Sequence, residues 1–169
     1  RDNHECVSTS RAPLLHYLGF NILKKRMEEI SMELTGESCL PQFKPTVFSD
    51  ESAGSTFLEL HQLIMQRSDE LRKEELFYIL FSRLFGNYAH TSLRSFPLRS
   101  TQIKKACEYL ESHASETITL DDICRRVSVS KSSLIRSFSE QLGLTPHSYL
   151  MSIRLKPFLN KAYLHHARH

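Results

Sequence analysis

Two short helices, separated by only three residues, are predicted in the last third of the sequence. Thr119 followed by Asp122 forms a capping box, which predicts a helix that begins near residue 120. Ser130 is a second N-cap candidate, and Gly143 is a favourable helix terminator. So short a connection leaves few ways to pack the two helices against each other. The pattern predicts a helix-turn-helix whose second helix runs over about 131–142.

The predicted second helix has an apolar face and a polar face. Leu134, Phe138 and Leu142 recur every four residues and are expected to face the core. The opposite face carries hydroxyl groups, one branched apolar side chain and one cation, with no carboxylate before Glu140. Such a surface suits the edges of base pairs in the DNA major groove. The side chains expected there are Ser132, Ile135, Arg136 and Ser139.

Each of these side chains has an expected contact. Arg136 is expected to bond guanine O6 and N7, Ile135 to contact a thymine methyl group, and Ser132 to contact a base edge or a phosphate. Cations nearby are expected to bind phosphates, which gives salt-dependent affinity without sequence discrimination. From spacing alone, a helical hairpin with a solvated outer face explains the pattern equally well. The predicted DNA-binding set is Ser130, Lys131, Ser132, Ser133, Ile135, Arg136, Ser139, Arg125 and Arg126.

Positive charge is concentrated in the second part of the chain. Residues 1–97 carry 11 Lys and Arg against 13 Asp and Glu, whereas residues 98–169 carry 11 against 6. Only the second part is therefore expected to be attracted to a polyanion. The aperiodic segment at 87–100 lies where the balance changes sign, and it predicts two domains, 1–95 and 96–169.

The first predicted domain contains amphipathic helices at 20–35, about 56–67 and about 69–86. The last two are expected to pack antiparallel because only a few residues separate them. A strand at 14–22 and a turn-rich connector at 39–55 are further predictions. With another helix at about 100–113, the predicted class is all-α: a helical dimerisation or regulatory module followed by a helix-turn-helix.

The third of these helices has more apolar residues than one buried face needs. Such an excess indicates burial on more than one side, either inside this chain or against a second copy. Both explanations fit the sequence. The residues predicted for dimerisation are Leu76, Phe77, Leu80, Phe81, Leu84 and Phe85.

A set of apolar, capping and cationic residues recurs in order over 101–155: Leu120, Ile123, Cys124, Ser130, Leu134, Arg136, Phe138, Gly143, Pro146, Tyr149, Arg154 and Leu155. Through these residues, 101–155 resembles the first, homeodomain-like helix-turn-helix of the AraC/XylS family of bacterial transcription regulators. Ser128 departs from the family pattern, which usually has Gly there. The departure matters because a left-handed backbone costs more with a side chain.

Residues 14–95 resemble the helical end of the family's regulatory domain, through their helix order and LeuProGlnPhe at 40–43. The family's cupin barrel and second helix-turn-helix are not recognisable, and Pro157 is expected to kink or end the last helix. No effector pocket is therefore expected in these residues.

The resemblance implies a sequence-specific transcription regulator that binds double-stranded DNA. Two further partners are expected. One is a second copy of the chain, bound through the N-terminal helices, and the other is RNA polymerase. The alternative is a helical protein–protein interaction module, or a truncated regulator that forms dimers with partners. No enzyme activity is expected, because neither a phosphate-binding glycine loop nor a triad spacing is recognisable.

No cofactor, metal or membrane is expected either. His165, His166 and His169 are adjacent or nearly so, which suits a tail better than a metal site. Four cysteines without CxxC spacing suit free thiols in a reducing cytosol, and Cys124 is expected to be a buried thiol rather than a redox sensor.

Overall fold

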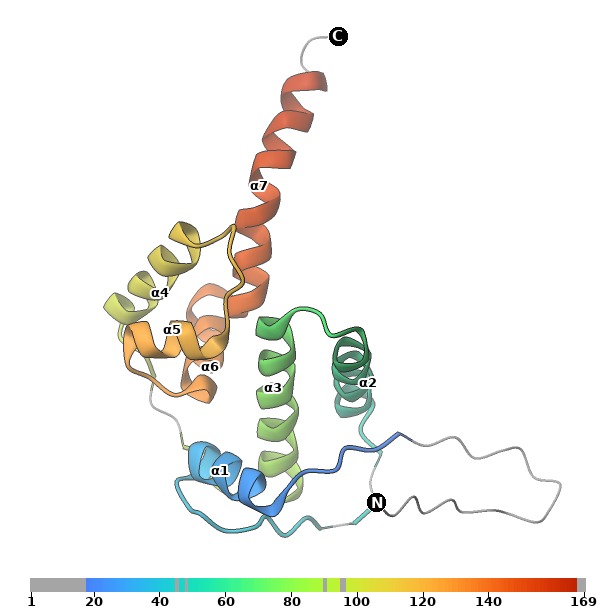
Figure 1. The fold of residues 1–169 in the computed structure, drawn as a ribbon. Coiled ribbons are helices and arrows are strands. Elements are labelled where there is room, and N and C mark those ends of the chain that lie inside the picture. Colours follow the sequence, from blue (N-terminus) through green and yellow to red (C-terminus); the bar gives the residue numbers. More distant parts are fainter. Residues whose placement is uncertain (1–17, 45, 48, 90, 95–96, 167–169) are drawn as a thin grey trace, which may run out of the picture.

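The computed structural model describes residues 18–44, 46–47, 49–89, 91–94 and 97–166. These residues form seven α-helices and no strand, which confirms the predicted all-α class. In Figure 1, α3 stands between α2 and the group formed by α4, α5 and α6. The helices are α1 (Lys24–Thr35), α2 (Glu51–Gln66), α3 (Glu70–Tyr88), α4 (Ser100–Ser112), α5 (Leu120–Val127), α6 (Lys131–Leu142) and α7 (Pro146–His166).

Several predicted elements differ in the structure. Helix α1 begins at Lys24 rather than at residue 20. Residues 18–22 are irregular rather than a strand, and the rest of the predicted strand, 14–17, lies outside the described residues. Helix α2 begins five residues earlier than predicted, because Asp50 accepts a hydrogen bond from Ala53 N–H at 2.9 Å and caps the helix.

Helices α2 and α3 pack antiparallel, as predicted. Asp50, at the start of α2, accepts hydrogen bonds from Arg83 at 2.7 Å and Tyr88 at 3.0 Å, near the end of α3. Arg72, near the start of α3, pairs with Glu59 of α2. The connection between the two helices is short because two of its residues, Arg67 and Asp69, adopt left-handed backbone conformations.

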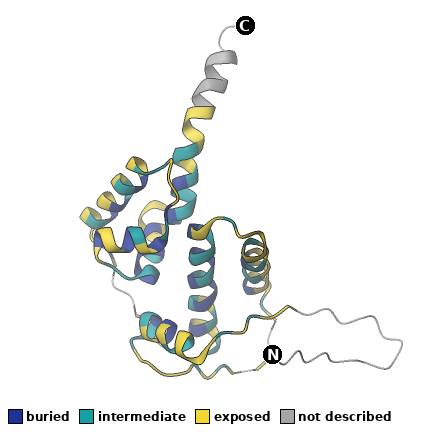
Figure 2. Ribbon diagram, in the orientation of Figure 1, coloured by how far each residue is buried: buried dark blue, intermediate teal, exposed yellow. Residues whose placement is uncertain are grey.

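Helix α3 is buried on more than one side, and Figure 2 shows buried residues along its whole length. Leu76 and Leu80 pack in a cluster with Leu60 of α2. Phe81 and Phe85 belong to a larger cluster that includes residues of α1 and of α4 to α7. Burial inside the chain therefore accounts for the apolar excess. Of the six residues predicted for dimerisation, only Phe77 and Leu84 are partly exposed, so a dimer through this set stays an untested prediction.

The larger cluster crosses the predicted domain boundary. It joins Leu34 of α1 and Phe85 of α3 to Leu110, Leu134 and Leu150 of the second part. The connecting segment is also fixed to α6, because Leu98 N–H donates to Ser137 Oγ at 3.0 Å and Gln141 Nε2 donates to Leu98 O at 2.8 Å. The predicted domains therefore share a buried core in this conformation.

Helix α7 continues through Pro157 to His166, so of the two effects expected of this proline, an end of the helix is wrong, whereas a kink stays a prediction. Proline removes one backbone N–H, but its fixed φ is compatible with a helix, and the flanking residues continue the helical backbone. No helix in the described ranges has both the length and the apolar character needed to span a bilayer.

Candidate nucleic-acid interface

The helix-turn-helix predicted from capping residues is present in α5 and α6. Thr119 Oγ1 accepts from Asp122 N–H at 3.3 Å, and the Asp122 carboxylate accepts from Thr119 N–H at 3.0 Å. Ser130 Oγ accepts from Ser133 N–H at 3.3 Å and so caps α6. Gly143 ends α6 with a left-handed φ of 68°. The start of α5, the start of α6 and the end of α6 are therefore capped by the residues from which they were predicted.

The turn between the two helices depends on Ser128, which has φ 54° and ψ 55°. This is the left-handed region, where a Cβ atom is unfavourable and glycine is not. Val129 N–H donates to Cys124 O at 3.2 Å and closes the turn. The departure from the family pattern at Ser128 therefore coincides with a strained backbone.

The packing beneath the two helices is mostly as predicted. Leu120, Ile123, Leu134 and Phe138 are fully buried, and the Phe138 ring contacts the Tyr149 ring edge-on. Leu142 is an exception, since it is 39% exposed. The inner apolar stripe of α6 therefore ends at Phe138 rather than at Leu142.

The predicted base-reading face of α6 is covered by the first part of the chain. Ser132 is only 8% exposed and Ile135 only 6%. Ile135 belongs to the same buried cluster as Tyr78 and Phe81 of α3, and Ser132 N–H donates to Glu33 Oε1 at 3.2 Å. Helical spacing placed these residues opposite the Leu134 face, but the expectation that they are open to a groove is wrong in this conformation.

The other two base-reading candidates lie nearer the edge of the covered face. Ser139 is exposed, and its hydroxyl donates to Ile135 O at 3.0 Å. Arg136 is half-buried, and its guanidinium makes no hydrogen bond or ion pair with any residue in the described part of the chain. Within the described ranges, the guanidinium donors of Arg136 are therefore not engaged.

Lys131, a predicted phosphate contact, is held by carboxylates. Its Nζ lies 2.8 Å from Glu74 Oε1 and 3.0 Å from Asp121 Oδ2. It also lies 5.7 Å from the centre of the Tyr78 ring. Burial acts to lower the pKa of Lys131, but the hydrogen bonds to Glu74 and Asp121 outweigh burial and leave that pKa raised. The cation is therefore charged and already paired.

The predicted capping hydroxyls and α5 arginines differ in accessibility. Ser130 and Ser133 are occupied in the α6 cap, where the two hydroxyls lie 2.9 Å apart. Arg125 and Arg126 are both exposed, and Arg125 pairs with Asp122. Arg126 is exposed like Arg125, but it makes no ion pair with a described residue.

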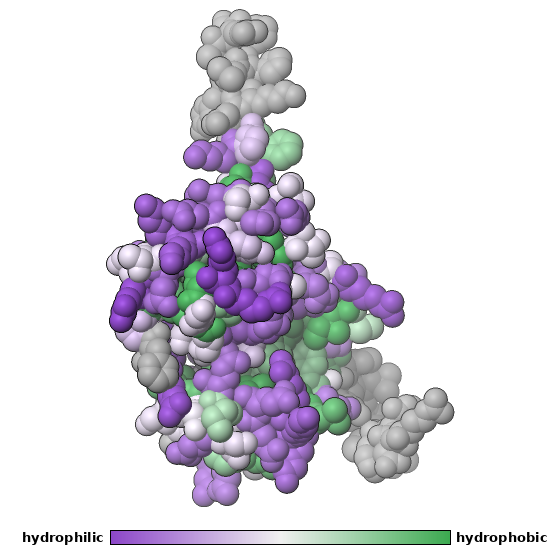
Figure 3. All heavy atoms as spheres, turned by 60° about the vertical axis from the view of Figure 1, so that its left-hand side comes forward, coloured by the Kyte–Doolittle hydropathy of each residue, from purple (hydrophilic) through white to green (hydrophobic). Residues whose placement is uncertain are grey.

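A hollow of about 490 Å³ beside the turn is lined by three cations, Arg99, Lys105 and Arg126. In Figure 3 the side of the molecule with α4, α5 and α6 is turned forward, and most of its surface is hydrophilic. Sequence reasoning missed Arg99 and Lys105. The available signal was the polar face of the predicted helix at 100–113, which brings Lys105 next to the helix-turn-helix once α4 packs on α5.

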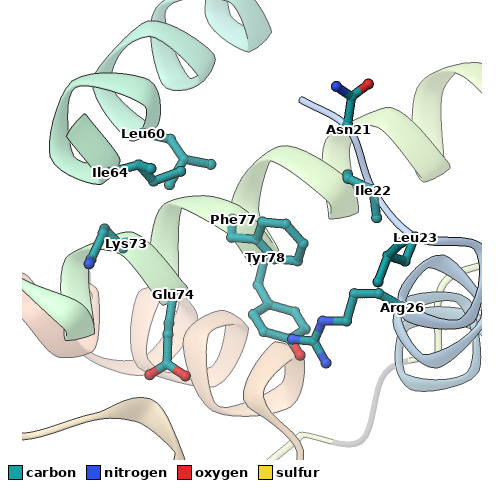
Figure 4. A pocket seen from close by; sticks show the side chains of 10 residues that line it. All are labelled: Asn21, Ile22, Leu23, Arg26, Leu60, Ile64, Lys73, Glu74, Phe77 and Tyr78. Carbon is teal, nitrogen blue, oxygen red and sulfur yellow. The ribbon is translucent and has the colours of Figure 1, made fainter. Parts of the chain in front are cut away.

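A second hollow, of about 390 Å³, lies between α1, α2 and α3 (Figure 4). Its apolar lining includes Leu60, Ile64 and Phe77. Its charged lining consists of Arg26, Lys73 and Glu74. The sequence predicted no effector pocket here.

No group of three or more His, Cys, Asp or Glu side chains within the described residues is arranged to hold a metal ion. The side chains of His165, His166 and His169 fall outside that part.

Comparison with known proteins agrees with the helix-turn-helix geometry. The AraC family model of bacterial regulatory helix-turn-helix proteins matches residues 110–151, from the end of α4 into α7. The uncharacterized HTH-type transcriptional regulator YbfI of Bacillus subtilis is 38% identical over 156 residues, which is 92% of this chain and 56% of YbfI. The lactose operon transcription activator of Staphylococcus xylosus is 24% identical over 102 residues, 56% of this chain and 37% of that protein. No solved structure matches.

The chain spans about half the length of YbfI and a smaller share of the other relatives. The family match covers α5, the turn and α6, where the capping pattern is observed. Residues 110–151 therefore form a helix-turn-helix similar to that of the AraC family of bacterial regulatory proteins, and the regulator YbfI is similar to most of this chain.

Proposed function

We propose that the chain is a sequence-specific DNA-binding transcription regulator with α6 as its recognition helix. The observation that carries the proposal is the pair α5 and α6, capped and joined by a three-residue turn, within the residues that match the AraC family. The relatives are named as transcription regulators or activators, which favours this function over the alternative of a protein–protein interaction module.

The proposal gives the predicted side chains distinct roles. Arg136 bonds a guanine and Ile135 contacts a thymine methyl group, while Ser132 and Ser139 contact base edges or phosphates. Arg125, Arg126 and Lys131 bind phosphates, and Ser130 and Ser133 lie at the N-terminus of α6, where backbone N–H groups also attract phosphate. Arg99 and Lys105 extend this basic surface along α4.

The test begins by selecting duplexes from a random library with the purified chain and measuring affinity by fluorescence anisotropy. The logarithm of the affinity is expected to fall linearly with the logarithm of salt concentration. Arg126→Ala is expected to weaken binding to all sequences alike and to reduce the salt slope by about 0.9. Lys24→Ala is the matched control, because it removes one exposed positive charge from α1.

Arg136→Ala tests base reading. It is expected to weaken binding to the selected duplex by about 1–3 kcal/mol and to relax the preference at one base pair. An unchanged sequence preference in this variant would remove Arg136 from the recognition surface. Salt-independent binding by the parent chain would contradict the whole proposal.

The partners follow from the same proposal. Two copies are expected to place their α6 helices on half-sites about 34 Å apart, or a multiple of that spacing. Selected duplexes are then expected to contain a repeated half-site, and sedimentation with DNA is expected to show two chains per duplex. Contact with RNA polymerase is tested by transcription in vitro from a promoter that carries the selected site.

A further inference from the structure

We propose that α1 and α3 hold the helix-turn-helix in an autoinhibited state, with carboxylates in the positions that DNA phosphates take in the bound state. The inhibitory groups are Glu33, Glu74 and Glu75, which we call the carboxylate clamp. The inhibitory role rests on the proposed DNA-binding function, although the clamp can be tested without DNA.

Each carboxylate of the clamp bonds the N-terminus of a different helix. Glu74 Oε2 accepts from Leu120 N–H, the first residue of α5, at 2.7 Å. Glu33 Oε1 accepts from Ser132 N–H, the second residue of α6, at 3.2 Å. Glu75 Oε2 accepts from His147 N–H, the second residue of α7, at 2.9 Å. Three helix starts are thus bonded by three anions from α1 and α3.

The caps of these helices leave these N–H groups available to an external anion. Thr119, Ser130 and Thr145 bond the N–H of the third residue of α5, α6 and α7, respectively. The first N–H groups of a helix otherwise have no partner within the helix, and they carry its positive partial charge. Phosphate oxygens bind such groups in protein–DNA complexes. The clamp therefore satisfies the donors that a DNA backbone is suited to satisfy.

The clamp also removes other parts of the predicted DNA surface. Glu74 pairs with Lys131, a predicted phosphate contact, at 2.8 Å. The same packing of α1 and α3 buries Ser132 and Ile135, so a duplex has no access to these side chains while the contact is formed. Asp69 adds a contact between α3 and α7, since its Oδ2 lies 2.9 Å from His147 Nε2.

Inhibition follows from mass action. Only chains in which α1 and α3 have moved away can place Ser132 and Ile135 in the groove, so the apparent affinity for DNA is the intrinsic affinity multiplied by the open fraction. Weakening the clamp raises that fraction. The clamp therefore predicts a gain of DNA binding on removal of the Glu33 or the Glu74 carboxylate.

The first test measures, without DNA, how strongly α1 and α3 block access to the covered face of α6. Ser132→Cys and Ser139→Cys are labelled separately with a maleimide in the full chain, and labelling is followed by mass spectrometry of tryptic peptides. The two positions lie on the same helix, one covered and one exposed. Ser132→Cys is expected to be labelled at least tenfold more slowly. Equal rates would overturn the proposed cover and leave the DNA-binding proposal standing.

The second test weakens the clamp and uses variants matched in charge. Glu74→Ala is compared with Glu70→Ala on α3, and Glu33→Ala with Glu29→Ala on α1. Both control carboxylates are exposed and pair with a cation on their own helix. Glu74→Ala and Glu33→Ala are each expected to speed labelling of Ser132→Cys and to raise affinity for the selected duplex by about tenfold relative to their controls.

The outcomes separate the two proposals. If the Glu74 and Glu33 variants speed labelling but bind DNA no more tightly than their controls, the inhibitory role is overturned while the parent's own DNA binding still supports the function. If labelling speeds up and no variant binds any duplex, the DNA-binding function fails and the inhibitory role fails with it.

Discussion

The backbone N–H of His147 donates a hydrogen bond to Glu75 Oε2 at 2.9 Å, although the two residues lie on opposite sides of the predicted domain boundary. Glu75 is fully buried, and its Oε1 accepts from Arg72 at 2.8 Å. Both oxygens of this carboxylate are therefore satisfied without water. A buried charge with two such partners links α3 to α7 tightly.

Glu75→Ala is expected to lower the free energy of unfolding by about 2–3 kcal/mol, because it breaks a buried ion pair and leaves the His147 N–H without its partner. Arg72 keeps Glu59, which limits the loss. Urea denaturation followed by circular dichroism measures the change. Glu70→Ala removes an exposed charge from the same helix and is expected to cost less than about 1 kcal/mol. A similar loss in both variants would show that the burial of Glu75 has no special effect.

Ser128→Gly is expected to stabilise the chain by about 1 kcal/mol, since glycine adopts the observed left-handed conformation without strain from a side chain. Ser139→Gly, in the exposed part of α6, is the control and is expected to destabilise by about 0.5 kcal/mol. Thermal unfolding of the two variants therefore moves in opposite directions. A lower stability for Ser128→Gly would mean that the Ser128 side chain supports the turn.

The helix-turn-helix was predictable because its signals are local. Thr119, Ser130 and Gly143 act within three or four residues of themselves, so their types and spacing determine where α5 and α6 begin and end. The apolar periodicity of α6 likewise predicted that Leu134 and Phe138 lie underneath. Local rules fail at Leu142, which is the last residue of α6 and lies beyond the packing of its neighbours.

The cover over α6 was not predictable from these rules. Glu33 and Ser132 are 99 residues apart, and Glu74 and Leu120 are 46 apart. Helical spacing assigns Ile135 to one face of α6, but it contains no information about which other helix packs on that face. The apolar excess of α3 was the available signal, since it required burial on several sides, but it did not distinguish α6 from a second copy.

Asp50 is expected to make stability depend on acid pH. The hydrogen bond from Arg83 and then that from Ala53 N–H lower the pKa of Asp50 to about 2. The pKa of an aspartate in an unfolded chain is about 3.9. The contribution of Asp50 to the free energy of unfolding is therefore present above that pH and is lost as the pH falls towards 2.

The difference in unfolding free energy between the parent and Asp50→Asn should therefore shrink from about pH 5 to pH 2, as measured by urea denaturation. Glu51→Gln changes the neighbouring exposed carboxylate and serves as the control. A difference that stays constant over this range would contradict the assigned contacts of Asp50.

Cys124 is expected to react slowly with thiol reagents in the native chain. Burial raises its pKa to about 12, so almost no thiolate is present at pH 8. Cys39 is exposed and is expected to react before Cys124, which should react fully only in urea. Ellman's reagent with peptide mapping measures both rates, and a native rate for Cys124 close to that of Cys39 would favour a redox role for this thiol.

The rate at Cys124 also tests the movement of α1 and α3. The charges that influence the pKa of Cys124 include that of Glu33, which bonds Ser132 N–H, and that of Lys131, the first residue of α6. When α1 and α3 move away, Cys124 loses part of the packing and charge around it. Cys124 is therefore expected to be labelled faster in Glu74→Ala than in Glu70→Ala. Because Cys124 is a native residue, this comparison needs no introduced cysteine. A rate that is the same in both variants would mean that opening of the clamp does not reach the packing beneath α5.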